Sequence, residues 1–349
     1  MDDLGRLALD LVNIPSVSRQ EQRVTAWIAE RVAGLPHVRV VHRQDDAIVF
    51  GPTGRADVVL AGHSDTVPEQ GNLPGRLEDG HVHGLGAADM KGSLAVMLAL
   101  AAELDRLAPA LRPLFVVFGR EELPIDESVL AGLLTTCPAI LEARLAVMME
   151  PTANRLQLGC LGNVKASLEF RGVAAHSARP WLGVNAIHEA VRGLRRVADA
   201  EPLEVVLDGL PFREVVSVTE IAGGVANNVI PDRVVCGLNY RYAGHRTPAA
   251  AEERLRELVG PDGELTVLSN AASAPVAVDN PLLRRLRAAG DLAVEPKQAW
   301  TPVAEFAARG LDAVNFGPGD PQFAHRRDER VGVQAMSDTL SVLRRFLSG

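Results

Sequence analysis

The chain has 349 residues, of which 47% are hydrophobic and 23% are charged, a composition typical of a folded globular protein rather than a disordered one. Its formal net charge is -8, with acidic residues spread along the chain, which argues against the concentrated basic face that nucleic-acid binding requires. No apolar stretch reaches the roughly 20 residues of a membrane span, and the N-terminus lacks a signal-peptide pattern, so we expect a cytoplasmic protein without a membrane or nucleic-acid partner.

The N-terminal segment predicts two helices followed by two short strands. Apolar residues recur at helical spacing over residues 2–35, with one interruption at "NIPSVS". Pro15 ends the first helix there, and Ser18 can cap the start of the second. Residues 38–44 and 46–51 then have the pattern of short strands around a polar turn.

Uninterrupted apolar runs mark the strands that follow. Residues 56–65, "ADVVLAGHSD", form the first run, and the same pattern returns at residues 113–122, 144–151 and 311–320. Such runs are typical of strands covered on both faces. Helical segments lie between them, the clearest at residues 90–107. Apolar strands alternating with helices predict a three-layer α/β domain with a largely parallel, mixed sheet.

The order of elements changes between residues 164 and 277. Strand and helix patterns follow one another there as β-α-β-β-α-β, which is the ferredoxin-like split pattern. We therefore predict an α+β domain at residues 164–277 that is inserted into a first domain made of residues 1–163 and 278–349.

Ionisable side chains follow the apolar runs of the first domain. In open α/β sheets, functional groups gather just beyond the carboxyl ends of the strands. The residues found there, or just before the long helix, are two histidines and five carboxylates: His63, Asp65, Asp89, Glu121, Glu122, Glu150 and His325. We expect these side chains to meet at one edge of one sheet.

This ligand set indicates a metal site for hydrolysis. Two histidines and several carboxylates without thiolates suit zinc, cobalt or manganese. One metal with three protein ligands would leave carboxylates over, whereas two metals about 3.5 to 4 Å apart, bridged by a carboxylate, would use them all. The three cysteines, Cys137, Cys160 and Cys236, have no CxxC spacing, so neither a disulfide framework nor a thiolate zinc site is indicated.

The other candidate ligands are interpreted as ordinary surface residues. His81 and His83 have ligand-like spacing, but no strand end stands behind them, and Asp126 and Glu127 have the pattern of an exposed helix start. The same interpretation covers His37, His42, His188 and His245.

Seven motifs, in order along nearly the whole chain, resemble those of the dizinc amidohydrolases that include succinyl-diaminopimelate desuccinylase, acetylornithine deacetylase, aminoacylase and glutamate carboxypeptidases. They are "GHSDTVP" at 62–68, "GLGAADMKG" at 84–92, "EEL" at 121–123, "MEPT" at 149–152, "GVAAHSARP" at 172–180, "ANNVIPD" at 226–232 and "GPGDPQFAHRRDE" at 317–329.

The resemblance implies a role for each residue at the sheet edge. His63 and Glu150 would bind one zinc ion, and Glu122 and His325 the other, with Asp89 bridging the two. Asp65 would orient His63, and Glu121 would be the general base. Two Zn²⁺ per chain are expected, with Co²⁺ as a substitute. Adjacent residues leaving a strand point to opposite sides, so Glu121 and Glu122 can divide these roles.

The resemblance also implies that the inserted domain is a lid and the dimer interface of a homodimer. His176 would donate a hydrogen bond to the oxyanion in the partner subunit's active site. The first domain would then be the three-layer catalytic domain of a zinc hydrolase, acting on a linear amide.

The substrate is expected to be an N-acyl amino acid, and the motifs most resemble those of succinyl-diaminopimelate desuccinylases. On that resemblance Asn227, Asn228 and Arg241 would meet the substrate carboxylates; the alternative for Arg241 is a surface salt bridge. Pro302 and Glu305 depart from the desuccinylase pattern, which disfavours an acidic acyl group. Acetylornithine deacetylase or another N-acyl-amino-acid hydrolase or carboxypeptidase is therefore an alternative activity. A catalytically inactive binding protein with the same fold is a more remote alternative.

Overall fold

The computed structural model describes residues 2–349, which form two compact units. The first unit comprises residues 2–159, 276–295 and 301–349. The second comprises residues 160–275 and 296–300. The short segment 296–300 was expected in the first domain, and its sequence carries no sign that it leaves that domain.

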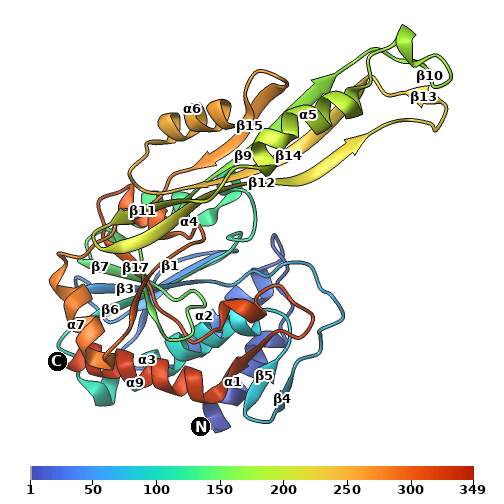
Figure 1. Cartoon of the computed structure of the whole chain (residues 1–349). Helices are drawn as coiled ribbons and strands as arrows, with labels where there is room; N and C mark the ends of the chain where they lie inside the picture. Colours follow the sequence, from blue (N-terminus) through green and yellow to red (C-terminus); the bar gives the residue numbers. More distant parts are fainter. Residues whose placement is uncertain (1) are drawn as a thin grey trace. The chain divides into compact units, whose positions relative to one another are not determined.

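An eight-stranded mixed sheet lies at the centre of the first unit, in the order β1-β2-β6-β3-β7-β17-β8-β16 (Figure 1). Its strands are β1 (Arg39–Gln44), β2 (Ala47–Gly51), β3 (Val58–His63), β6 (Pro113–Phe118), β7 (Leu145–Met148), β8 (Leu156–Leu158), β16 (Val294–Pro296) and β17 (Ala313–Asn315). The central strands β6, β3, β7 and β17 are parallel, and β2 and β8 join them antiparallel. The α/β class with a mixed, largely parallel sheet is therefore confirmed.

Helices cover this sheet on both faces. Figure 1 shows α3 and α9 on one face and α4 on the other. The helices of the unit are α1 (Asp2–Val12), α2 (Gln22–Ala33), α3 (Gly92–Leu107), α4 (Val129–Thr136), α7 (Pro281–Gly290), α8 (Val303–Ala307) and α9 (Val333–Ser348), with the short turns η1 (Ala87–Lys91), η2 (Ile125–Glu127), η3 (Pro138–Ile140) and η5 (Pro321–Phe323). Because both faces are covered, every residue of β2, β3, β6 and β7 is buried.

A second, small sheet in the same unit joins segments from opposite ends of the chain. It has the order β18-β5-β4, with β4 (Arg76–Glu78), β5 (His81–His83) and β18 (Arg330–Gly332). Arg330 pairs with His83 across the antiparallel β5–β18 ladder. The "DGHVHG" stretch, read as turn-rich surface, is therefore partly a strand.

The second unit is a five-stranded antiparallel sheet with two helices. Its strand order is β11-β12-β14-β9-β15, which apart from β11 is the ferredoxin-like order. The elements are β9 (Gly162–Arg171), β10 (Ala175–His176), η4 (Pro180–Leu182), α5 (Ala186–Ala198), β11 (Leu203–Leu207), β12 (Leu210–Gly223), β13 (Val229–Ile230), β14 (Arg233–Tyr242), α6 (Pro248–Val259) and β15 (Glu264–Ala271). The additional strand β11 forms a hairpin with β12 that the sequence pattern did not indicate.

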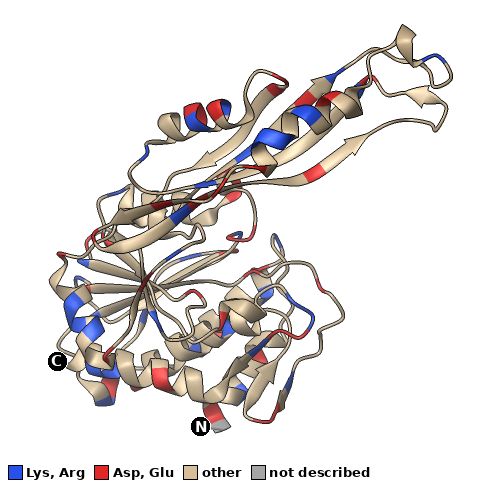
Figure 2. Ribbon diagram, viewed as in Figure 1, with Lys and Arg blue, Asp and Glu red and all other residues tan. Residues whose placement is uncertain are grey.

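The charged residues of both signs are interspersed in each unit, as Figure 2 shows. The second unit has its own apolar core, in which Phe170, Tyr240 and Tyr242 are buried between the sheet and helices α5 and α6. None of the helices in the described part of the chain has the length and apolarity needed to cross a membrane.

Candidate metal centre

Three parallel strands deliver ionisable side chains to the same edge of the large sheet. His63 is the last residue of β3, Glu121 and Glu122 follow β6, and Glu150 follows β7. Because β6, β3 and β7 are parallel neighbours, their carboxyl ends lie side by side. Asp89 comes from the turn η1 ahead of α3, and His325 from the segment that leads into β18.

These residues form two potential ligand sets that share one carboxylate. His63, Asp89 and Glu150 make the first set, and Asp89, Glu122 and His325 make the second. In each set the possible ligand atoms lie within 4.8 Å of one another. The Nε2 atom of His63 is 2.9 Å from one carboxylate oxygen of Asp89, and Nε2 of His325 is 3.5 Å from the other. Asp89 therefore stands between the two histidines.

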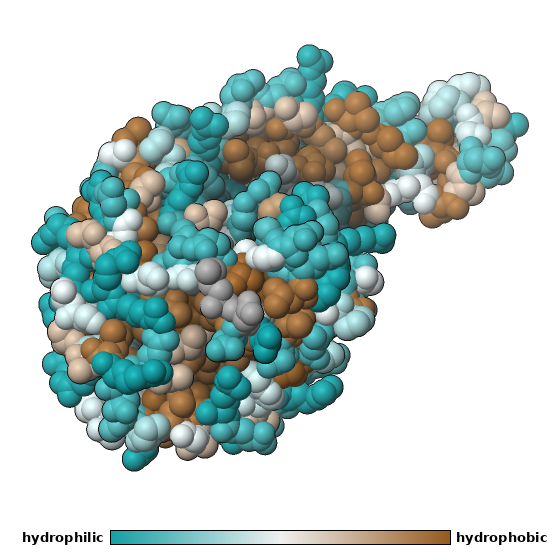
Figure 3. Space-filling model, turned by 90° about the horizontal axis from the view of Figure 1, so that it is seen from below, coloured by the Kyte–Doolittle hydropathy of each residue, from teal (hydrophilic) through white to brown (hydrophobic). Residues whose placement is uncertain are grey.

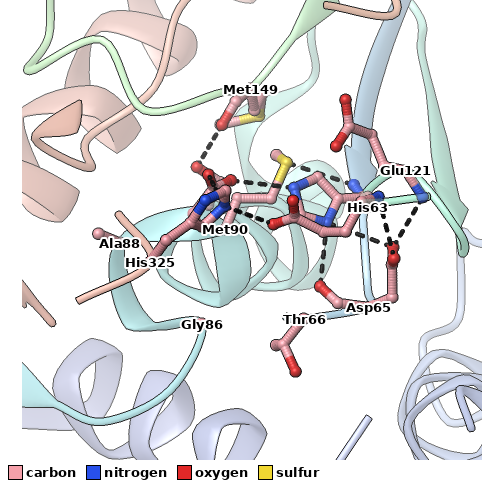
Figure 4. A network of polar contacts seen from close by, with 12 residues as sticks. His63, Asp65, Thr66, Gly86, Ala88, Met90, Glu121, Met149 and His325 are labelled. Atoms are coloured by element: carbon pink, nitrogen blue, oxygen red, sulfur yellow. Dashed lines mark hydrogen bonds and ion pairs between the residues drawn. The ribbon is translucent and has the colours of Figure 1, made fainter. Parts of the chain in front are cut away.

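The donor atoms of both sets fit a pair of divalent metal ions. Each set offers one imidazole nitrogen and two carboxylates, a mixture that suits zinc and its neighbours. Figure 4 shows His63 and His325 directed towards the same space from two distant parts of the chain. The side chains of Asp89 and Glu122 are 12% and 10% exposed, whereas His325 is half exposed. The site is thus closed around its carboxylates and open on the side of His325.

Glu121 lies beside this pair of sets without belonging to either. It forms a third set with His63 and Glu122, again within 4.8 Å. Burial raises the pKa of Glu121 well above its usual value, and the charges of Glu150, Glu122 and Asp89 raise it further against the opposing effect of His63. A carboxylate in such surroundings has a strong tendency to take up a proton.

Asp65 holds both His63 and the backbone of the glutamate pair. Its carboxylate accepts hydrogen bonds from the backbone N–H of Glu121 at 3.1 Å and of Glu122 at 3.2 Å. Nδ1 of His63 lies 3.0 Å from the Asp65 backbone oxygen and 3.4 Å from its carboxylate. Although burial opposes it, hydrogen bonds from His63 and Ser18 hold the pKa of Asp65 below its usual value. Asp65 therefore positions two segments that carry potential ligands, the end of β3 and the glutamate pair (Figure 4).

Ser18 has a different role from the helix cap expected for it. Helix α2 starts after Glu21, and no side chain caps it. The Ser18 hydroxyl instead donates to the Asp65 carboxylate at 2.8 Å. The prediction of a cap was wrong because a local pattern of serine before a helix cannot reveal a partner 47 residues away.

A strained turn directly after β6 carries the glutamate pair. Arg120 has a φ of 59°, in the left-handed region that disfavours a residue with a side chain. Two interactions hold it: its backbone N–H donates to the buried Glu21 carboxylate at 3.2 Å, and its guanidinium is 2.9 Å from Asp46. At the preceding Gly119, a Cβ atom would lie only 2.8 Å from the Glu21 side chain. Glycine at 119 and Glu21 together therefore fix the turn.

Glu329 supports the turn that carries Asp89. Its carboxylate is buried and accepts hydrogen bonds from three backbone N–H groups of residues 86–89. Burial raises the pKa of Glu329 to about 7, and these hydrogen bonds oppose the rise. Sequence reasoning missed Ser18, Glu21 and Glu329 as parts of the site; only Glu329 lay within a motif that had been singled out.

The four other predicted site residues lie in the second unit. His176 is in β10, which pairs with β13, so that His176 is opposite Val229. Asn227 and Asn228 form the exposed turn just before β13, and the Ser177 N–H donates to the Asn228 oxygen at 2.9 Å. Arg241 is near the far end of β14, where it donates to the Asn239 side chain at 2.8 Å. The structure thus brings His176 and the two asparagines together but sets Arg241 apart from them.

Arg241 forms no ion pair with any carboxylate of the described residues, unlike the surface salt bridge considered for it. Its guanidinium is partly buried, and that burial lowers its pKa. The histidines interpreted as surface residues, His37, His42, His81, His83, His188 and His245, contribute to none of the ligand sets formed by residues 2–349.

Glu305, one of the two departures from the desuccinylase pattern, is buried in the first unit. Only 7% of it is exposed, and the Ser128 hydroxyl donates to its carboxylate at 3.2 Å. Burial raises the pKa of Glu305 to about 7, against the hydrogen bond from Ser128 and the charge of Arg309. Its carboxylate is therefore engaged at the N-terminus of α4, whose first residues follow Ser128.

Residues 59–349 match the family described as peptidase family M20/M25/M40. A Corynebacterium glutamicum succinyl-diaminopimelate desuccinylase is 39% identical over 97% of this chain and 94% of its own length. A Mycobacterium tuberculosis protein provisionally named succinyl-diaminopimelate desuccinylase is 39% identical over 98% of this chain and 97% of its own length. Acetylornithine deacetylase of Myxococcus xanthus is 32% identical over 96% of this chain and 92% of its own length.

Solved structures share the fold over the whole chain. A Staphylococcus aureus tripeptidase superposes with a TM-score of 0.82 at 18% identity, covering 99% of this chain and 97% of that one. An M20 family metallo-carboxypeptidase of Sulfolobus solfataricus gives 0.77 at 16% identity, covering 99% of both chains. A Bacillus subtilis protein described as a dinuclear metal-binding peptidase from the M20 family gives 0.69 at 14%, covering 99% and 97%.

The buried Glu305 predicts a stability that depends on pH. Its pKa rises from 4.5 in an exposed chain to about 7 in the folded protein. The Glu305 carboxyl group thus binds its proton more tightly in the folded protein than in the unfolded chain. Its ionisation destabilises the folded state increasingly as pH rises from about 4.5 through about 7. Replacing Glu305 by Gln should therefore raise the free energy of unfolding by about 2 kcal/mol more at pH 8 than at pH 5.

Urea unfolding at both pH values measures this difference. The exposed Glu142, replaced by Gln, is the matched control and should show no pH-dependent gain. An equal gain for Glu305→Gln at pH 5 and pH 8 would contradict the buried, proton-holding carboxyl group.

Proposed function

The chain belongs to peptidase family M20/M25/M40 and is a metal-dependent amidohydrolase, and on that premise we propose that it hydrolyses N-succinyl-LL-2,6-diaminopimelate to succinate and LL-diaminopimelate. The observation that carries the hydrolytic activity is the pair of ligand sets sharing Asp89, with Glu121 beside them. The substrate rests on similarity, since two relatives that share 39% identity over nearly the whole chain carry the name of this desuccinylase.

Two zinc ions are the proposed metals, with cobalt as a substitute. His63 and Glu150 would hold one ion, Glu122 and His325 the other, and Asp89 both, because the two ligand sets intersect at Asp89. When bound, the metals supply Lewis acidity, which lowers the pKa of water and polarises a carbonyl group. The dinuclear site described for the Bacillus subtilis neighbour supports a count of two.

Glu121 is the proposed general base. It would take a proton from the attacking water and pass it to the departing amide nitrogen, so that the nitrogen leaves as an amine. Its position supports this role, since it reaches the ligand sets without being needed in either of them. The backbone of Glu121 is held by Asp65 at 3.1 Å, which fixes where its side chain starts. Asp65 is accordingly proposed to orient both His63 and the base.

Arg241, Asn227 and Asn228 are proposed to bind the substrate carboxylates, and His176 to donate to the oxyanion. Arg241 has no acidic partner among residues 2–349, which supports its proposed role in binding a substrate carboxylate. Eight residues of extended β14 separate Arg241 from Arg233, or roughly 26 Å, and His176 lies beyond Arg233 next to β13. One small substrate cannot span that distance, so His176 and Arg241 at one active site would come from two subunits.

A homodimer formed through the second unit is therefore part of the proposal. Most of the large apolar side chains that are exposed among the described residues belong to this unit, including Trp181 at 76% and Val191 at 66%. Figure 3 shows apolar side chains gathered over it. Exposed apolar surface of this kind is typical of an interaction site. We also propose that residues 164–277, in the second unit, are the lid domain. The first unit would be the catalytic domain.

A cytoplasmic location is proposed as well. The buried free thiols of Cys137 and Cys236 support it, because reduced thiols suit a reducing compartment.

An N-acetyl-amino-acid hydrolase is the second candidate activity. It is favoured by the similarity to acetylornithine deacetylase.

Replacing Glu121 by Gln tests the base. We expect kcat to fall by about 100- to 10,000-fold while each chain keeps its two zinc ions, because the ligands are untouched. Zinc content by atomic emission and steady-state kinetics are the measurements, with Glu142→Gln as the control. Turnover above about 1% of wild type with full zinc would exclude Glu121 as the base. A purified wild-type chain that binds no zinc would instead exclude the dizinc centre.

A comparison of three substrates tests the specificity. N-succinyl-LL-2,6-diaminopimelate, N-acetylornithine and N-acetyl-lysine are assayed at equal enzyme and metal concentration. The proposal expects the highest kcat/KM for the succinyl substrate, because its additional carboxylate can pair with Arg241. A higher value for N-acetylornithine would replace the proposed substrate with that of the second candidate.

Mixing two inactive variants tests the shared active site. Glu121→Gln has an intact His176, and His176→Ala has an intact Glu121. If His176 acts in the partner subunit, subunit exchange should restore about a quarter of the wild-type activity, since half of the dimers are mixed and each has one complete site. No recovery, with mixed dimers shown by mass spectrometry, would place His176 in its own subunit's site or outside it.

A further inference from the structure

Glu329 makes an unusual number of contacts with the turn that carries Asp89. Only 2% of the residue is exposed. One carboxylate oxygen accepts hydrogen bonds from the backbone N–H groups of Ala88 at 3.0 Å and Asp89 at 3.1 Å, and the other accepts from Gly86 at 3.0 Å. Figure 4 shows Gly86 and Ala88 on this turn, below and beside His325. A single buried side chain therefore accepts hydrogen bonds from three backbone N–H groups of one turn.

The turn is one that requires such support. Gly86 has a φ of 75°, in the left-handed region, and Asp89 and Met90 have non-helical dihedral angles inside η1. N–H groups in such a turn lack the partners that a regular helix would provide. The Glu329 carboxylate replaces those partners, and it is the best-suited acceptor, because an ionised carboxylate accepts with both oxygens.

Glu329 also belongs to the segment that carries the other end of the metal centre. It follows His325 in "HRRDE" and immediately precedes β18, which pairs with β5 through Arg330 and His83. Its own backbone oxygen accepts from the Gly84 N–H at 3.0 Å. Residues 81–89 and 325–332 are thus joined by a strand ladder, a backbone hydrogen bond and the carboxylate.

We propose that Glu329 is a positioning residue which holds Asp89 against His325 and thereby sets the affinity of the metal centre. The inference rests on the metal centre proposed above, in which Asp89 serves both ions. Asp89 and His325 already approach to 3.5 Å, so a shift of the turn would move Asp89 relative to both histidines. Residues that orient ligands in this way commonly change metal affinity without contacting the ion.

Glu329→Gln is the decisive variant. It keeps the size of the side chain but replaces one carboxylate oxygen with an NH₂ group. This donor then faces backbone N–H donors, so the hydrogen bonds on that side are lost and the groups repel one another. Asp328→Asn is the matched control, since Asp328 is the neighbouring acid and is paired with Arg326 rather than with the turn. Both are prepared as full-length protein, stripped of metal and titrated with Zn²⁺ against a chromophoric chelator.

The expected result is zinc affinity weakened by about 10- to 100-fold in Glu329→Gln and unchanged within about twofold in Asp328→Asn. Co²⁺ titration provides a second readout: the visible absorption of bound cobalt should shift in the Gln variant because the ligand geometry changes. Excess Zn²⁺ should restore much of kcat, which loss of a catalytic group would not allow. Wild-type zinc affinity and an unchanged cobalt spectrum in Glu329→Gln would overturn the inference.

Thermal unfolding of the metal-free proteins separates positioning from general stability. Positioning requires the Gln variant to lose zinc affinity while its metal-free Tm stays within a few degrees of wild type. If Glu329→Gln does not fold, Glu329→Asp, which keeps the charge on a shorter side chain, is titrated in its place, and wild-type affinity in that variant overturns the inference. Failure of the wild-type chain itself to bind zinc or cobalt would refute the metal centre rather than the role of Glu329.

Discussion

Repulsion between like charges is the constraint on which this structure depends. Asp65, Asp89, Glu121, Glu122 and Glu150 meet at one edge of one sheet, largely out of contact with water. Carboxylates so placed need positive partners or hydrogen-bond donors, because burial makes an unpaired charge very costly. Two histidines supply part of this compensation, and the metal ions of the family would supply the rest. Much of the surrounding backbone serves to keep the acids in place.

Two buried carboxylates that are not proposed ligands carry out that task in the same way. Asp65 accepts from the backbone of Glu121 and Glu122, and Glu329 accepts from the backbone of the Asp89 turn. Each binds main-chain N–H groups, so it fixes where the side chain of a proposed ligand begins and leaves that side chain free to bind a metal ion. Glu21 acts similarly behind Arg120. The proposed ligands can therefore lie on loops and still be held in place by hydrogen bonds to their backbone, as a preorganised site requires.

Much of the centre could be predicted because the relevant signals are local. Apolar runs identify the buried strands, and the carboxyl ends of parallel neighbours lie together, so His63, Glu121, Glu122 and Glu150 were placed at one edge from their positions alone. The hairpin strand β11, the strand character of residues 81–83 and the membership of residues 296–300 in the second unit were not predicted. Their patterns are short, and only pairing with distant segments defines them.

The sequence by itself therefore determined the fold class, the residue types of the ligand sets and the family. Only the tertiary structure decided which groups hold those ligands: Ser18 contacts Asp65 rather than capping a helix, and Glu329 reaches the Asp89 turn from 240 residues away. The reason is physical. Apolar periodicity and strand ends reflect the chain's own local geometry, whereas a buried carboxylate finds its donors only when the completed fold excludes water and leaves those backbone N–H groups no other partner.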